Sequence, residues 1–199
     1  MRDEIRVLRM RDEVLEKKKP TTLKGEIISW SVTILGTLAA VLLINTFVFR
    51  TVEVQGNSMF PTLSDGDRII VWQLFYNPGF QDIIVLEHTN GVFHVKRILG
   101  VAGDHVDYID GELFVNDTLI SEPYILDEQS NVGFLFSDLC QLSAGRHVCD
   151  EIPNGYFLVL GDNRNNSGDS REYGLIHESQ IMGRATLRFL PFSDFGLVN

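Results

Sequence analysis

The chain contains 199 residues, 44% of them hydrophobic, which is enough for one domain of moderate size and an accessory segment. Its formal net charge of −10 argues against a nucleic-acid partner, because nucleic-acid phosphates are neutralised by a basic surface. The charge is uneven: residues 1–26 hold eight basic and six acidic side chains and so carry +2, whereas the remainder carries −12.

The first predicted element is a membrane-spanning helix at residues 27–49. These 23 residues contain no charged side chain, and as a helix they would extend about 34 Å, enough to cross a hydrocarbon core of ~30 Å. Buried core helices rarely keep such a run beyond ~14 residues. A cleavable signal peptide has an apolar part of ~7–15 residues and a small-x-small exit, whereas this run ends in the bulky Phe47-Val48-Phe49. We therefore predict a single uncleaved transmembrane helix, with the lipid bilayer as its partner.

The charges beside this helix predict its orientation. The basic flank precedes the apolar run, and Arg50 is the only nearby positive charge after it. Cytoplasmic flanks carry the excess of Lys and Arg in membrane proteins. We therefore expect a single-pass protein of the cytoplasmic membrane, with residues 1–26 in the cytoplasm and residues 50–199 as an extracytoplasmic domain.

The outer domain is predicted to be mainly β, an antiparallel-rich sheet or barrel-like structure. Short segments rich in β-branched and aromatic residues alternate with Gly, Asp, Asn and Pro, the pattern of hairpins. No long amphipathic helix pattern follows residue 50. The predicted strands are 68–72, 82–86, 92–98, 112–115, 155–160 and 183–189.

Residues 122–150 interrupt this rhythm, and we interpret them as an excursion inserted in the domain rather than a domain of its own. They contain the two cysteines, Cys140 and Cys149. Outside the cell a disulfide between them can persist and is the favoured interpretation, although two free thiols stay possible. His147 alone does not complete a zinc site with them.

Ser58 is the first candidate for chemistry. It stands in a turn-like setting after Gly56-Asn57, where most serines are ordinary turn formers. The Gly-x-Ser-x-Gly nucleophile elbow does not fit, because its fifth residue would be Phe60. A Ser-x-x-Lys motif does not fit either, because Pro61 occupies the lysine position. A base must therefore come from elsewhere in the chain.

Lys96 is the best candidate base. It lies in the predicted strand 92–98, where alternation places it on one face with His94 and Ile98. A lysine in a strand is usually solvated, and Lys96-Arg97 could protect a sheet edge. The alternative is a buried amine, because burial lowers the pKa of a lysine and lets the neutral amine accept a proton from serine.

The segment 161–174 is dense in Asp, Asn, Ser and Gly, which predicts a loop. It does not fit an EF-hand calcium loop, because the third position from Asp162 is Arg164 and no helices flank it. It offers side chains that could hold the lysine amine or form a fixed pair behind it, namely Ser167 for the first role and Asp169 with Arg171 for the second.

Four segments in order, behind a membrane span, resemble the motif boxes of bacterial type I signal peptidases. They are 58–63 (SMFPTL), 66–71 (GDRIIV), 96–104 (KRILGVAGD) and 161–171 (GDNRNNSGDSR). Each segment alone is weak, but the four in this order are specific. The resemblance covers roughly residues 27–190.

The resemblance implies a membrane-bound serine endopeptidase that removes signal peptides from exported preproteins after small-x-small sites, typically Ala-x-Ala. By matching positions, Ser58 is the nucleophile and Lys96 the general base. Ser167 orients Lys96, and Asp169 with Arg171 supports the site. The resemblance implies no metal and no cofactor.

The resemblance also implies an oxyanion hole and a substrate groove. The Ser58 N–H would be one donor, and some relatives supply the second from a hydroxyl residue two positions earlier. This chain has Gly56 there, so a backbone N–H near Gly56 is the candidate. The preprotein would add a strand beside residues 52–56. The residues expected to line shallow pockets are Val52, Val54, Met59, Leu63 and Val95.

The sequence leaves three alternatives to this function. Signal peptidases of the endoplasmic-reticulum type have His in the base position, where this chain has Lys96, with His94 two residues away. A Ser–Lys autoproteolytic repressor would need a DNA-binding domain, whereas the first 50 residues here predict a membrane anchor. A membrane-tethered binding module without activity stays open.

Overall fold

A computed structural model of the chain describes residues 23–87, 92–126, 133–137, 139 and 150–199. The chain divides into two compact units, with the boundary between Ile44 and Asn45. Residues 1–22 of the predicted cytoplasmic segment lie outside the described residues. So do Cys140 and Cys149, and with them the predicted disulfide.

Helix α2, Leu23–Phe47, is long and apolar enough over Leu23–Ile44 to cross a membrane. Every side chain of that stretch is exposed, which suits surroundings of lipid rather than a protein core. Its hydroxyl side chains are compatible with this role, because Ser31 Oγ donates to the carbonyl oxygen of Ile27 at 2.8 Å. Two later threonines bond their i−4 carbonyls in the same way.

The helix and the predicted membrane segment have different bounds. The helix begins four residues before Ile27, and it ends at Phe47. Phe49 is already the first residue of strand β1, Phe49–Glu53. Aromatic and β-branched residues are frequent from here on, as is typical of strands. The last part of the apolar run therefore belongs to the sheet.

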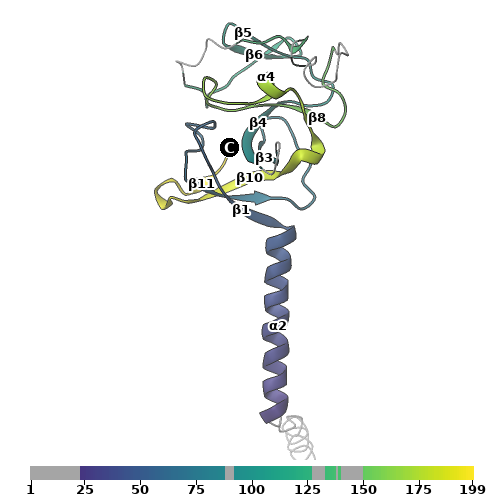
Figure 1. Cartoon of the computed structure of the whole chain (residues 1–199), viewed down its shortest axis with the longest axis vertical. Coiled ribbons are helices and arrows are strands. Elements are labelled where there is room, and N and C mark those ends of the chain that lie inside the picture. Colours follow the sequence, from purple (N-terminus) through teal and green to yellow (C-terminus); the bar gives the residue numbers. More distant parts are fainter. Residues whose placement is uncertain (1–22, 88–91, 127–132, 138, 140–149) are drawn as a thin grey trace, which may run out of the picture. The chain divides into compact units, whose positions relative to one another are not determined.

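The second unit contains a large antiparallel sheet (Figure 1). Its strand order is β1-β2-β10-β3-β4-β8-β9, and β11 pairs with β10. The bounds after β1 are β2 Arg68–Trp72, β3 Ile83–Glu87, β4 Phe93–Gly100, β8 Tyr156–Leu160, β9 Ile176–His177, β10 Ile181–Leu190 and β11 Gly196–Leu197. Every pairing in it is antiparallel.

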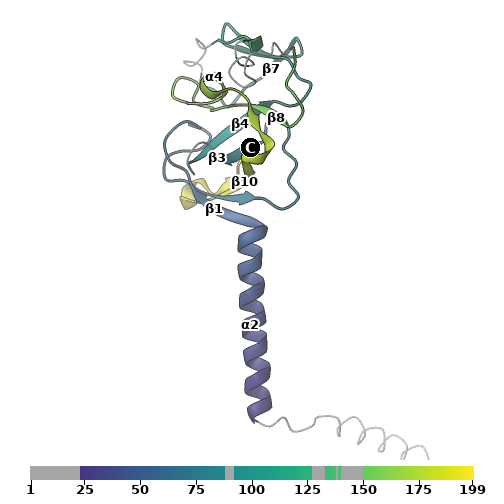
Figure 2. The same cartoon turned by 45° about the vertical axis from the view of Figure 1, so that its right-hand side comes forward.

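A smaller antiparallel sheet has the order β5-β6-β7. Its strands are β5 Val106–Ile109, β6 Glu112–Val115 and β7 Thr118–Ile120. In both views it lies at the opposite end of the second unit from β1 (Figure 1, Figure 2). The short helices are α4 Ser170–Tyr173 and the 3-10 turns η3 Glu178–Gln180 and η4 Phe192–Asp194.

The mainly β, antiparallel fold predicted from the sequence is confirmed. The six predicted strands are present as β2, β3, β4, β6, β8 and β10, with ends that differ by at most two residues. Strands β1, β5, β7, β9 and β11 were not predicted. Most of them are short or lie at sheet edges, so they carry little apolar alternation of their own.

The smaller sheet is joined to the larger one by a shared apolar core. Tyr108 and Leu113 of the smaller sheet pack in one cluster with Leu158 and Leu160 of β8. Two described residues of the predicted excursion 122–150 belong to the same cluster and are fully buried, namely Phe136 and Leu139. This part of the excursion is therefore integral to the domain core.

Strand β4 lies inside the large sheet, between β3 and β8. Lys96 is opposite Ile84 of β3, and Arg97 is opposite Leu160 of β8. Both side chains are buried, with 2% and 3% of their surface exposed. The interpretation of Lys96-Arg97 as a pair that protects a sheet edge is therefore wrong, since β4 has a neighbour on each side.

Substitution of Gly183 by Ala should destabilise the domain. A Cβ at Gly183 in β10 would lie 2.2 Å from the backbone oxygen of Trp72 in β2, so the two strands would have to separate. We expect a loss of about 1–3 kcal/mol, measured as a fall of several degrees in Tm. Gly196→Ala is the matched control, because nothing lies within 4 Å of its added Cβ. Equal Tm values for both variants would contradict this packing.

Candidate active site

Ser58 and Lys96 meet although they are 38 residues apart in sequence. Lys96 Nζ donates to Ser58 Oγ at 2.8 Å. Lys96 comes from the middle of β4, whereas half-buried Ser58 comes from the turn between β1 and β2. The structure therefore brings together the two residues that the sequence predicted as base and nucleophile.

The turn that carries Ser58 is anchored in the core by two buried side chains. Met59 and Leu63 are fully buried in the cluster that also contains Val54 and Val95. The Leu63 N–H donates to the Met59 carbonyl at 2.9 Å, which closes one helical turn between the two anchors. Because both side chains point into the core, the turn has a fixed position from which Ser58 faces β4.

The surroundings of Lys96 favour its neutral form. Burial lowers the pKa of Lys96 to about 8, against an ordinary value of 10.5. Asp169 and Asp162 act in the opposite direction, and Arg171 lowers the pKa of Lys96 further. The neutral form of the amine is therefore populated at a much lower pH than in an exposed lysine. The amine is thereby suited to accept a proton near neutral pH.

The predicted pair of Asp169 and Arg171 is formed. Asp169 Oδ1 accepts from Arg171 Nε at 2.7 Å, and Asp169 Oδ2 accepts from Arg171 Nη2 at 2.7 Å. Asp169 also caps the N-terminus of α4 and accepts from the Gly161 N–H at 3.1 Å. Asp169 has no exposed surface, so this pair is a fixed part of the interior.

Ser167 lies in the loop between β8 and α4, and it does not bond Lys96 in this structure. Its Oγ is buried and has no hydrogen-bond partner among the described residues. A Cβ at Gly161 would lie 2.3 Å from Ser167 Oγ, so this hydroxyl packs directly on the Gly161 backbone. Its assignment as the group that orients Lys96 stays a prediction.

Gly161 allows the loop after β8 to approach the nucleophile turn. An added Cβ there would also lie 2.4 Å from the Ser58 carbonyl oxygen, which leaves no room for a side chain. The Asn163 N–H donates to that oxygen at 3.0 Å, and Asn163 Nδ2 donates to the Asn57 carbonyl at 3.0 Å. Backbone contacts therefore fix the loop and the turn against each other.

The backbone at Gly56 has a partner of its own. Gly56 adopts φ +80°, which favours glycine, and its N–H donates to Asp65 Oδ1 at 2.7 Å. The second oxyanion donor was predicted to be a backbone N–H near Gly56. The Gly56 N–H itself is already engaged in this hydrogen bond. The Ser58 N–H has no acceptor within the part of the chain that the structure describes.

A groove of about 500 Å³ opens beside the dyad. Its lining residues are Val52, Glu53, Val54, Gln55, Ser58, Val92, Phe93, His94, Val95, Lys96 and Gly168. Three of the five predicted pocket residues are among them, namely Val52, Val54 and Val95. Met59 and Leu63 do not line it, because they are buried beneath it in the same cluster as Val54 and Val95.

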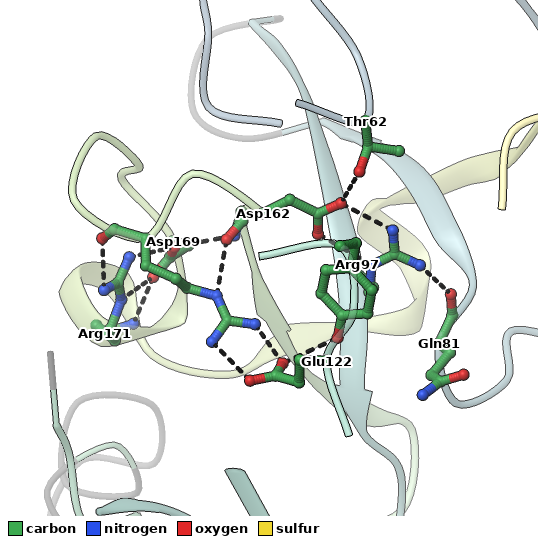
Figure 3. A network of polar contacts seen from close by, with 10 residues as sticks. Thr62, Gln81, Arg97, Glu122, Asp162, Asp169 and Arg171 are labelled. Carbon is green, nitrogen blue, oxygen red and sulfur yellow. Dashed lines mark hydrogen bonds and ion pairs between the residues drawn. The ribbon is translucent and has the colours of Figure 1, made fainter. Parts of the chain in front are cut away.

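A buried polar network joins the strand of Lys96, the turn of Ser58 and the loop after β8 (Figure 3). Asp162 is its centre on one side: it accepts from both Nε and Nη2 of Arg97, at 2.9 and 2.8 Å, and from the Thr62 hydroxyl. On the other side Arg164 pairs with Glu122. Apart from the edge-protecting pair suggested for Arg97, sequence reasoning gave these residues no role. Four of them stand inside the quoted motif segments, namely Thr62, Arg97, Asp162 and Arg164, whereas Glu122 carried no signal.

A family model and two sequence relatives indicate one family. A family model described as signal peptidase, peptidase S26, matches residues 27–190. The signal peptidase IB of Staphylococcus aureus (strain COL) is 36% identical over 183 residues, which cover 87% of this chain and 94% of that protein. The signal peptidase I of Bacillus licheniformis is 32% identical over 185 residues, covering 90% and 97%. The crystal structure of a signal peptidase I from Enterococcus faecalis V583 has a TM-score of 0.47 and 30% identity, covering 56% of this chain and 98% of that chain.

The amine of Lys96 should titrate near pH 8. Because burial disfavours the charged form, its folded pKa lies below the ordinary 10.5, and the amine becomes neutral as pH rises through about 8. NMR of protein labelled in the lysine side chain should show one Nζ or Cε signal that titrates there. That signal should be absent from Lys96→Met. A chain in which every lysine titrates near 10.5 would contradict the buried amine.

Proposed function

The chain belongs to the signal peptidase family, peptidase S26, and we propose that it cleaves exported preproteins with Ser58 as nucleophile and Lys96 as general base. Removal of signal peptides by a serine peptidase is the activity of this family. The observation that supports the residue assignment is the 2.8 Å contact between Ser58 Oγ and the buried Lys96 Nζ.

Acylation follows from that contact. The neutral amine of Lys96 accepts the hydroxyl proton of Ser58 while Oγ forms a bond to the carbonyl carbon of the scissile peptide. The carbonyl oxygen becomes an oxyanion, and the Ser58 N–H is placed to donate to it. The C–N bond then breaks, and the Lys96 ammonium protonates the leaving amine. The mature protein departs, and the signal peptide stays bound as an ester.

Deacylation uses the same two groups. Lys96, neutral again, takes a proton from water while the water oxygen forms a bond to the ester carbon. The C–O bond to Ser58 breaks, and the Lys96 ammonium returns a proton to Ser58 Oγ. The signal peptide leaves with a new carboxylate. Because the lysine ends as it began, a dyad is enough for the cycle.

The groove suits small side chains. An extended peptide that adds a strand beside residues 52–56 would point alternate side chains to the same side. The apolar walls there are Val52, Val54 and Val95, backed by the buried Met59 and Leu63. The buried cluster to which these valines belong limits the room for side chains. This supports the proposal that the cut falls after small-x-small sites of the Ala-x-Ala type.

The supporting residues hold Lys96 in position. Arg171 pairs with Asp169 and itself lowers the pKa of Lys96, which offsets part of the rise that the Asp169 carboxylate causes. Ser167 is proposed to bond Lys96 during the cycle, because its buried Oγ has no other partner among the described residues. His94 also lines the groove, but the group that contacts Ser58 is Lys96, which favours a Ser–Lys over a Ser–His enzyme.

Helix α2 fits a single-pass membrane anchor. We propose that the membrane is the cytoplasmic membrane, that residues 1–26 lie in the cytoplasm, and that the domain from Arg50 onward lies on the extracytoplasmic face. The basic residues before the helix support this orientation. The signal peptide of the substrate is itself apolar, so an anchored enzyme meets it at the same bilayer.

Removal of either dyad group should abolish cleavage without unfolding the chain. Ser58→Ala should lower kcat by several orders of magnitude, because no hydroxyl is left to form the ester. Lys96→Arg keeps the charge but stays protonated, so it should be as inactive. Conversion of a preprotein to its mature size on a gel measures both. His94→Ala is the control and should retain most activity.

The dependence on pH separates the two possible bases. The kcat/KM of the wild type should rise through about pH 8, since Lys96 acts only when neutral, whereas a histidine base would sustain activity down to about pH 6.5. Turnover of Lys96→Arg near the wild-type rate, with an inactive His94→Ala, would assign the reaction to the Ser–His class.

Protease accessibility tests the orientation. External protease on spheroplasts should digest residues 51–199, whereas a tag fused before residue 1 should stay intact on immunoblots. The reason is the basic flank, which disfavours translocation of residues 1–26. Permeabilised spheroplasts are the control, in which the tag should be lost as well. Loss of the tag in intact spheroplasts would reverse the proposed topology.

A further inference from the structure

Two side chains outside the motif segments reach the network around the dyad. Glu122 and Tyr124 follow β7, in the segment that leaves the smaller sheet. Glu122 lies in Figure 3 between the network of Asp162 and that of Asp169. Neither residue lines the groove. They nevertheless contact two arginines, one on the strand that carries Lys96 and one on the loop that packs on the Ser58 turn.

The first contact is to the strand of the base. Arg97 follows Lys96 in β4, and its guanidinium lies over the ring of Tyr124, 3.8 Å from the ring centroid. The other contacts of Arg97 are the paired bonds to Asp162, a bond from Nη1 to the Gln81 carbonyl at 3.2 Å and a bond from Nη2 to the Asn199 carbonyl at 3.3 Å. These bonds lie in the plane of the guanidinium, so the ring of Tyr124 covers a face that they leave open.

The second contact is to the loop that packs on the nucleophile turn. Both Nη atoms of Arg164 donate to Glu122. Arg164 Nε donates to the Gly161 carbonyl at 3.0 Å, and the Arg164 carbonyl accepts from Arg171 Nη1 at 2.8 Å. Glu122 therefore holds the arginine that spans this loop, and Gly161 of the loop lies against Ser58.

The two contacts are joined, because the Tyr124 hydroxyl donates to Glu122 Oε1 at 2.9 Å. We propose that Glu122 and Tyr124 are positioning residues for the Ser58–Lys96 dyad, which clamp the base strand and the supporting loop together from the smaller sheet. This inference rests on the proposed function. It gives the segment after β7 a part in the reaction, although neither residue lines the groove.

The clamp acts on Lys96 through its surroundings. The charged groups that act on the amine are Asp169, Arg171 and Asp162, and His94 lies on the same face of β4. Both carboxylates pair with an arginine. Arg97, the partner of Asp162, lies over the ring of Tyr124. Arg171, the partner of Asp169, donates to the carbonyl of Arg164, which in turn binds Glu122. If the clamp loosens, water gains access to the amine. Hydration favours the charged form, so the acidic limb of the pH profile, along which activity rises as Lys96 becomes neutral, should move to higher pH.

The decisive variant is Tyr124→Leu, which removes the ring without changing any charge. In the full chain, solubilised in detergent and assayed on a preprotein, kcat should fall about tenfold or more, since small misplacements of reacting groups are costly. KM should change less than about twofold, because Tyr124 does not line the groove. The pH at which kcat/KM reaches half its maximum should rise by about half a unit or more.

Tyr156→Leu is the matched control. Tyr156 is also a half-buried tyrosine packed against the same core cluster, but its ring contacts His177 rather than an arginine. Tyr156→Leu should lower Tm as Tyr124→Leu does. It should leave kcat, and the pH at which kcat/KM reaches half its maximum, near the wild-type values. Tyr124→Phe keeps the ring over Arg97 and loses only the bond to Glu122, so its kcat should lie between those of Tyr124→Leu and wild type.

The outcomes distinguish the two proposals. A wild type without activity, or an active Ser58→Ala, contradicts the proposed function itself. An active wild type with an inactive Ser58→Ala supports the proposed function. The variants of Tyr124 and Tyr156 then test the positioning role separately. Tyr124→Leu and Tyr156→Leu with the same kcat and the same pH limb would overturn the clamp and leave both tyrosines as core residues.

Discussion

The structure depends on one constraint, which is that a lysine amine must lie within 2.8 Å of a serine hydroxyl and still be neutral part of the time. Water would keep the amine charged at neutral pH, so it has to be buried. Lys96 lies in the interior of the large sheet, with β3 and β8 on either side of β4, and only 2% of its surface is exposed. This burial is the largest influence on the pKa of Lys96 and would let it act as the proposed base.

Burial alone would not be enough, because buried carboxylates nearby would draw a proton onto the amine. Three carboxylates lie in the network, and each is paired with an arginine, as Asp162 with Arg97, Glu122 with Arg164 and Asp169 with Arg171. The three pairs are neutral together. The amine of Lys96 is left with the cost of burial as the largest influence on its pKa. The network therefore surrounds Lys96 with polar groups, while burial remains the largest influence on the pKa of its amine.

Local patterns were enough for part of this architecture. The apolar run indicated the helix, and runs of β-branched residues indicated the strands that have a buried face, such as β2 and β8. The order of the motifs indicated Ser58 and Lys96, which the fold then brings into contact. Alternation also placed Val95 on the face opposite Lys96, where it packs with Val54.

Contacts between distant segments could not be read in the same way. Met59 and Leu63 looked like pocket residues, and only the tertiary structure shows that the turn carries them into the core. The Asp65 bond to the Gly56 N–H depends on how the turn folds back on β1. Glu122 binds Arg164, which lies 42 positions later in the sequence, and no periodic pattern predicts this contact. Such pairings are set by the path of the chain rather than by local pattern.

The polar character of this interior has a physical reason beyond stability. Apolar residues of similar volume often replace buried ion pairs with no loss of stability. Apolar packing, however, tolerates small shifts, whereas hydrogen bonds to a carboxylate have fixed lengths and directions. Asp162 bonds Thr62 of the nucleophile turn and Arg97 of the base strand at once. A single carboxylate therefore fixes the distance between two segments that must present their reacting atoms to each other, and an apolar side chain in its place would fill the same space without fixing that distance.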